Sequence, residues 1–129
     1  MIKAYTDIIQ SKMLAAILSP ESADMWFGCI GESMKMCHVG NYLLELQCRQ
    51  DIDYRKTQPK IICPCWSLAA LFDTLPETIG SYSKMMGYFD DAYICDYIDE
   101  DGEGLGNGTM ADTLIDAVYE MVLKQNKPK

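Results

Sequence analysis

Two strand-like segments, Tyr82–Phe89 and Ala92–Ile98, are separated by only two residues, and this spacing constrains the fold more than any other feature of the chain. A two-residue connection joins antiparallel strands, so the segments predict a hairpin with Asp90 and Asp91 at its turn. The second segment places alternate residues on opposite faces of a sheet. These sets are Tyr93, Cys95 and Tyr97 on one face and Ile94, Asp96 and Ile98 on the other.

Three other segments have apolar residues at helical spacing. The first covers residues 4–18 and contains Tyr5, Ile8, Ile9, Lys12, Met13, Ala16 and Ile17 at that spacing. It ends at Ser19-Pro20, because a residue before proline avoids the α region, and Ser19 then caps a short turn.

The second and third predicted helices carry their own start signals. Within residues 64–76, Leu68, Leu71, Phe72 and Leu75 form one apolar stripe, with Ser67 as the N-cap. The last helix is predicted from about Met110 to Lys124, with Thr109 and Asp112 as a capping box.

Strand-like segments also occur at Met25–Ile30, at residues 42–48 and from Lys60 to Cys63. The order of elements is helix, strands, helix, hairpin, helix. This order predicts an α+β fold with one small antiparallel sheet of four to five strands and about three helices. A chain of 129 residues without a linker fits a single domain, residues 1–129.

Charge is distributed unevenly along the chain. From Met85 to Val122 there are ten carboxylates and no lysine or arginine, and the net charge of the chain is -8. A field of one sign repels phosphate backbones and anionic membranes and attracts basic protein surfaces. We therefore expect a protein partner with a basic surface, no direct nucleic-acid binding and no membrane binding.

The six cysteines are best explained as free thiols. No signal peptide opens the chain, so a cytoplasmic location is expected, and disulfides are rare in that compartment. Cys63, Cys65, Cys37 and His38 are the candidate zinc ligands, although their spacing does not match the paired ligands of structural zinc sites.

Other patterns that bear on chemistry are incomplete. Asp99-x-Asp101-x-Glu103-Gly104 opens like a calcium loop, but Met110 stands where a bidentate glutamate is needed. The one histidine has no partner motif, and Ser67 is explained by helix capping. The sequence therefore indicates no catalytic residue and no cofactor, and it favours a non-enzymatic role.

Three segments carry a resemblance to known proteins. They are Glu21-Ser22-Ala23-Asp24-Met25, Pro64-Cys65-Trp66-Ser67-Leu68-Ala69-Ala70-Leu71 through Leu75-Pro76, and Asp116-Ala117-Val118-Tyr119-Glu120-Met121. In this order they resemble small uncharacterised proteins of Bacteroides-type gut bacteria and of their phages and mobile elements. The resemblance implies an accessory protein of a phage or mobile element and supplies no catalytic residue.

These observations together predict an acidic protein-interaction module, and one version of it is a nucleic-acid mimic that occupies a basic groove on its partner. The predicted interaction surface consists of Asp99, Glu100, Asp101, Glu103, Asp112, Asp116 and Glu120. The alternative is a small zinc-binding protein or metal-dependent enzyme that uses the cysteines and His38. Self-association into a homo-oligomer is a third possibility.

Overall fold

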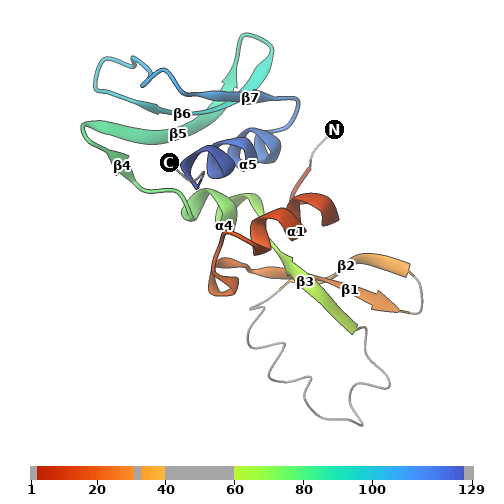
Figure 1. The fold of residues 1–129 in the computed structure, drawn as a ribbon. Helices are drawn as coiled ribbons and strands as arrows, with labels where there is room; N and C mark the ends of the chain where they lie inside the picture. The colour runs from red at the N-terminus through yellow and green to blue at the C-terminus, as the bar shows by residue number, and fades with distance from the viewer. Residues whose placement is uncertain (1–2, 31–32, 40–59, 127–129) are drawn as a thin grey trace. The chain divides into compact units, whose positions relative to one another are not determined.

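The structure, a computed structural model, describes residues 3–30, 33–39 and 60–126. The chain forms two compact units, which are described separately below and are drawn in Figure 1. Unit 1 comprises Met1–Ala4 and Leu71–Lys129, and unit 2 comprises Tyr5–Ala70. That the whole chain is one domain stays a prediction.

Unit 2 contains a helix, a short 3-10 turn and three strands. The helical elements are α1 (Ile8–Ala15) and η1 (Pro20–Ser22), and the strands are β1 (Met25–Ile30), β2 (Ser33–Val39) and β3 (Lys60–Cys65). Both β2 and β3 pair antiparallel with β1, which is the central strand. The strand predicted at residues 42–48 lies outside the described residues.

Helix α1 is shorter than predicted, and its buried face differs from the predicted stripe. Asp7 caps it, since the Asp7 carboxylate accepts from Gln10 N while the Gln10 side chain accepts from Asp7 N. Leu14 is fully buried, whereas Ile9 is 74% exposed. Because apolar residues occur on all sides of this helix, its sequence pattern alone does not determine which face packs.

Hydrogen bonds join the start of α1 to the residue that follows β3. Thr6 N donates to Trp66 O, and Trp66 N donates to the Thr6 hydroxyl, which is also 2.7 Å from the Ser11 hydroxyl. Thr6, Ser11 and Trp66 are fully buried, so these bonds satisfy polar groups that water cannot reach. The predicted turn is confirmed as well, with Ser19 as the cap of η1.

Helix α4 (Leu68–Asp73) begins at the predicted cap. The Ser67 hydroxyl accepts from Ala70 N, and the carboxylate of Asp24 accepts from both Ser67 N and the Ser67 hydroxyl. The carbonyls at the other end of this helix accept from Lys84, whose Nζ is 2.8 Å from Phe72 O. The positive charge of a lysine at that position stabilises the negative end of the helix dipole.

Unit 1 contains a four-stranded antiparallel sheet and the last helix. The strands are β4 (Thr78–Ile79), β5 (Tyr82–Phe89), β6 (Ala92–Ile98) and β7 (Thr109–Ala111), in that order across the sheet. The predicted hairpin is confirmed, with β5 and β6 paired from Ser83↔Ile98 to Phe89↔Ala92. Asp90 and Asp91 have φ values of 54 and 64°, which is the conformation of a two-residue primed turn.

Helix α5 (Leu114–Gln125) packs against β5, β6 and β7, as Figure 1 shows. The core between the helix and the sheet contains Cys95, Tyr97, Ile115, Val118, Met121 and Val122, all fully buried. The Tyr97 hydroxyl donates to Pro76 O at 2.6 Å, so the buried phenol has a partner.

The predicted capping box of this last helix is wrong. Thr109 starts β7, and its hydroxyl donates to Ala117 O at 2.5 Å. The cap is Thr113, whose side chain accepts from Asp116 N. The local sequence offered two threonines four residues apart, and the pairing of β7 with β6 draws the first of them into the sheet.

The predicted α+β class, the antiparallel pairing and the order of elements are confirmed for the described residues. The strands form one sheet of three and another of four, where the sequence suggested a single sheet of four to five. Strand patterns specify which residues share a face, but not which strands become neighbours.

The turn of the hairpin provides a test of its geometry. Asp90→Asn combined with Asp91→Gly should stabilise the chain by about 1 kcal/mol, because asparagine and glycine suit positive φ better than aspartate does. Urea unfolding measures this gain. The gain should persist in high salt, whereas a gain that salt abolishes would show that only charge repulsion was removed.

Candidate functional site

The two faces of the β5–β6–β7 sheet have different surroundings. Residues paired across antiparallel strands share a face, and the register pairs Met85 with Asp96, Gly87 with Ile94 and Ile94 with Met110. Those residues alternate with the ones that pack on α5, so they lie on the opposite face of the sheet. We call this the open face, because its side chains are half-buried or exposed.

The open face contains a groove of about 350 Å³. Its lining is mostly apolar, with one carboxylate, and consists of Met85, Gly87, Tyr88, Phe89, Ile94, Asp96, Ile98, Gly102 and Gly104. Phe89 is 70% exposed, and Met110, on the same face, is 71% exposed. Large apolar side chains that gather on a surface indicate a contact site more often than isolated ones do.

Gly87 leaves space in the floor of the groove. It lies within β5, where a glycine contributes no side chain to the face. A Cβ built on Gly87 would meet only the Met85 Cε, at 3.8 Å, which is an ordinary van der Waals contact. A methyl group at this position therefore fits against the sheet and occupies part of the groove.

Asp96 provides the polar atoms of the groove, and two glycines allow the following loop to approach it. Its Oδ1 accepts from Tyr97 N at 2.7 Å. A Cβ on Gly104 would lie 2.6 Å from Asp96 Oδ2, and a Cβ on Gly108 would lie 2.8 Å from the same atom. The loop backbone packs against the Asp96 carboxylate so closely that a Cβ atom does not fit. Positions 104 and 108 therefore require glycine.

The acidic loop after β6 is organised by its own side chains. Asp99 Oδ1 accepts from Asp101 N and from Glu103 N, both at 2.9 Å. Gly102 has a φ of 81° and donates its N–H to Asp99 O. Among the residues that the structure describes, no group of three or more His, Cys, Asp or Glu side chains is arranged to hold a metal ion.

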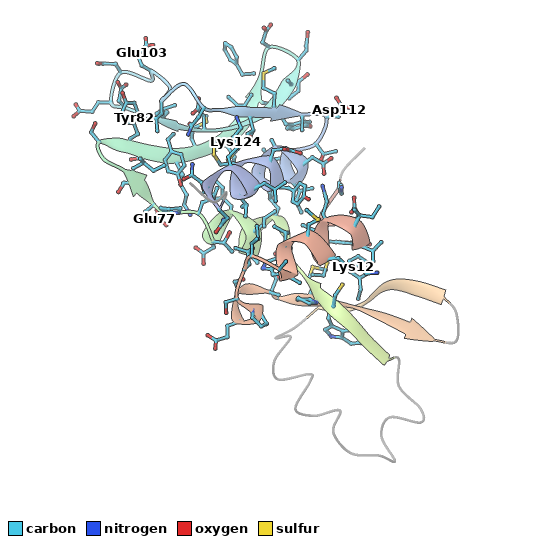
Figure 2. The ribbon with its side chains drawn as sticks, in the orientation of Figure 1. Lys12, Glu77, Tyr82, Glu103, Asp112 and Lys124 are labelled. Carbon is cyan, nitrogen blue, oxygen red and sulfur yellow. The ribbon has the colours of Figure 1, made fainter. Side chains whose placement is uncertain are left out.

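The seven residues of the predicted interaction surface lie in three places. Asp99, Glu100, Asp101 and Glu103 belong to the loop after β6, Asp112 lies between β7 and α5, and Asp116 and Glu120 are on α5. Figure 2 shows Glu103 and Asp112 at opposite ends of unit 1. Asp116 also pairs with Lys3 at 2.7 Å. The predicted residues therefore do not form one continuous cluster.

The charge of the chain is nevertheless concentrated in unit 1. This unit holds twelve Asp and Glu residues and five lysines, a net charge of −7 out of the −8 of the whole chain. Its described lysines have partners elsewhere: Lys3 with Asp116, Lys84 with Glu77 and helix carbonyls, and Lys124 with Asn107 O. Within the described part of the chain, no cation pairs with Asp96.

The candidate zinc ligands lie in unit 2. Cys63 and Cys65 are buried in β3, while Cys37 and His38 belong to β2, and β1 runs between these two strands. Strands on either side of a central strand are about 10 Å apart, so the backbones of the two pairs are separated by the width of β1.

The environment of the thiols favours their neutral form. Burial raises the pKa of Cys63, although nearby Lys12 partly offsets the effect. Burial also raises the pKa of Cys65 to about 11, against the opposing effect of hydrogen bonds from Thr6 and Ser11. The Cys65 thiol donates to Thr6 O at 3.4 Å. Such thiols pack as small apolar groups and are poor sources of thiolate.

Sequence reasoning missed most of the groove. It grouped Asp96 with Ile94 and Ile98, but it did not single out Gly87 or Phe89. The available signal was Gly87 itself, since a glycine inside an otherwise continuous strand marks a place where something else approaches the backbone.

Comparison with protein-family models, with curated proteins and with solved structures finds no match to this chain. None of the described helices is long and apolar enough to cross a membrane.

The contact of Asp96 with the glycine loop can be tested by a double-mutant cycle. Gly108→Ala should cost about 1–3 kcal/mol, because the new Cβ overlaps the Asp96 carboxylate. In an Asp96→Ala background the same substitution should cost clearly less, since the overlapping atoms are gone. Equal costs in the two backgrounds, measured by urea unfolding, would show that Asp96 and Gly108 are not in contact.

Proposed function

We propose that this chain is a non-enzymatic protein-interaction module, cytoplasmic and encoded by a phage or mobile element, which binds its partner through the open face of unit 1. The observation that carries the proposal is the asymmetry of the β5–β6–β7 sheet. One face is buried under α5, and the other exposes Phe89 and Met110 beside an apolar groove.

The side chains of the open face suit a protein contact. Exposed aromatic and methionine side chains supply apolar area that becomes buried on binding, and methionine adapts to partners of different shape. On the other face of the sheet, Tyr88 and Tyr93 form an edge-to-face pair with ring centroids 4.9 Å apart, next to the turn of the hairpin. This pair joins the two strands that carry Phe89 and Ile94.

Charge narrows the class of partner. The acidic residues of unit 1 repel phosphate backbones, so the proposal involves neither direct nucleic-acid binding nor membrane binding. They favour a partner with a basic surface. In one version of the proposal, that surface is the nucleic-acid-binding groove of a host protein, and the chain acts as a nucleic-acid mimic.

Site-specific photo-cross-linking tests the proposal. A photoreactive phenylalanine analogue is placed at Phe89, on the open face, or at Ile9 of α1, which is 74% exposed and so matches the 70% exposure of Phe89. In a lysate of a Bacteroides-type host, the analogue at position 89 should give one discrete adduct, and the analogue at position 9 should give none. Excess unmodified wild-type chain should abolish the adduct, whereas Gly87→Val chain should not.

Two results would contradict the proposal. An adduct only from position 9 would place the contact on α1, and an adduct at position 89 that Gly87→Val chain also abolishes would exclude the groove. The mimic version additionally requires duplex DNA to compete with adduct formation. Absence of competition would refute that version alone.

A further inference from the structure

The groove combines an apolar depression with a single carboxylate, and this combination specifies what can occupy it. We infer that the groove binds an extended segment of the partner protein in which an apolar residue is followed, two positions later, by lysine or arginine. This inference rests on the proposed function and names the chemistry of its ligand.

The spacing follows from the strand geometry of the groove itself. Ile94 faces the space above Gly87, and Asp96 is the next residue of β6 on the same face. Residues i and i+2 of a strand are about 7 Å apart. An extended ligand has the same repeat, so its residues i and i+2 can place an apolar side chain over Gly87 and a cationic side chain beside Asp96.

The carboxylate of Asp96 is available to a cationic side chain of a ligand. It accepts from Tyr97 N and packs against Gly104 and Gly108, and it has no cationic partner among the described residues. Met85, Ile94 and Ile98 line the same groove, and the Asp96 residue that they surround is half-buried. An ion pair in such a half-buried apolar setting is screened less than one on an open surface.

The surroundings of the groove reinforce this preference. Unit 1 has a net charge of −7, so a basic segment is attracted before contact and an acidic one is repelled. The loop with Asp99, Asp101 and Glu103 is continuous with the Gly102 and Gly104 wall of the groove. A basic residue that flanks the bound segment would meet this loop.

Selection from a random-peptide display library against the full chain tests the inference. Enriched peptides should share the pattern apolar, any residue, lysine or arginine. Asp96→Asn should weaken their binding about ten-fold, while Asp73→Asn, which removes the same charge from an exposed site outside the groove, should leave affinity nearly unchanged.

Filling the groove gives a second measurement with a matched control. Gly87→Val should abolish binding of the selected peptides, and Ser83→Val, on the same strand and face but outside the groove lining, should not. Both variants should unfold at or above the wild-type temperature, because valine suits a strand and the Gly87 Cβ has room.

The outcomes separate the inference from the proposed function. Peptides that Gly87→Val blocks but that lack a cation would overturn the inference and leave the proposed function standing. Basic peptides that bind Gly87→Val as well as wild type would overturn both. No enriched peptide at all would overturn the inference alone, because a folded partner can contact the open face without an extended segment. Self-association of the wild-type chain that Gly87→Val abolishes would identify a second copy as the occupant, and would overturn the inference too.

Discussion

The packing of α5 against one face of the β5–β6–β7 sheet is the interaction on which the account of this protein depends. Cys95 and Tyr97 of β6 are fully buried on that side, together with Ile115 and Val118 of α5. Because successive side chains of a strand point to opposite faces, Ile94 and Asp96 of β6 must lie on the other face of the sheet. The burial of one face therefore creates the exposure of the other.

The shape of the open face depends on glycines, which lack a side chain, as much as on the side chains that are present. Gly87 leaves a depression opposite Ile94, and Gly104 and Gly108 let the acidic loop pack against Asp96. An added Cβ would fill the first position and would collide with the carboxylate at the other two. Three glycines thus shape one surface for two different physical reasons, and none of the three depends on a positive φ.

Much of this fold could be predicted from local patterns. The two-residue turn predicts the β5–β6 hairpin, strand geometry assigns the faces of β6, and Ser67 is correctly predicted as a helix cap. Local patterns do not predict long-range pairing, so the predicted cap of the last helix is Thr109, whereas the helix begins after Thr113. The predicted buried face of α1 is also wrong, because Ile9 and Leu14 are equally apolar and only tertiary contacts decide between them.

The candidate site was partly visible in the sequence. Its charge was evident from the unbroken run of carboxylates, and we expected a partner with a basic surface on that ground alone. The structure distributes those carboxylates over a loop, a connection and a helix, and it places Asp96 in the apolar groove on the face of the sheet opposite α5. A count of charges does not reveal such an arrangement, since it depends on which residues share a face and on where a side chain is missing.

The most direct test of the central claim is the solvent exposure of individual methionine methyl groups in the intact chain. With ¹³C-labelled methionine methyls, a neutral paramagnetic gadolinium chelate broadens the signals that water reaches. If the open face is exposed to water, we predict strong broadening for Met110 and measurable broadening for Met85. The signals of Met121 and Met25, which are buried in their units, should stay sharp. If the signals of Met85 and Met110 stayed as sharp as that of Met121, the open face would be covered, and it could not be the surface that binds a partner.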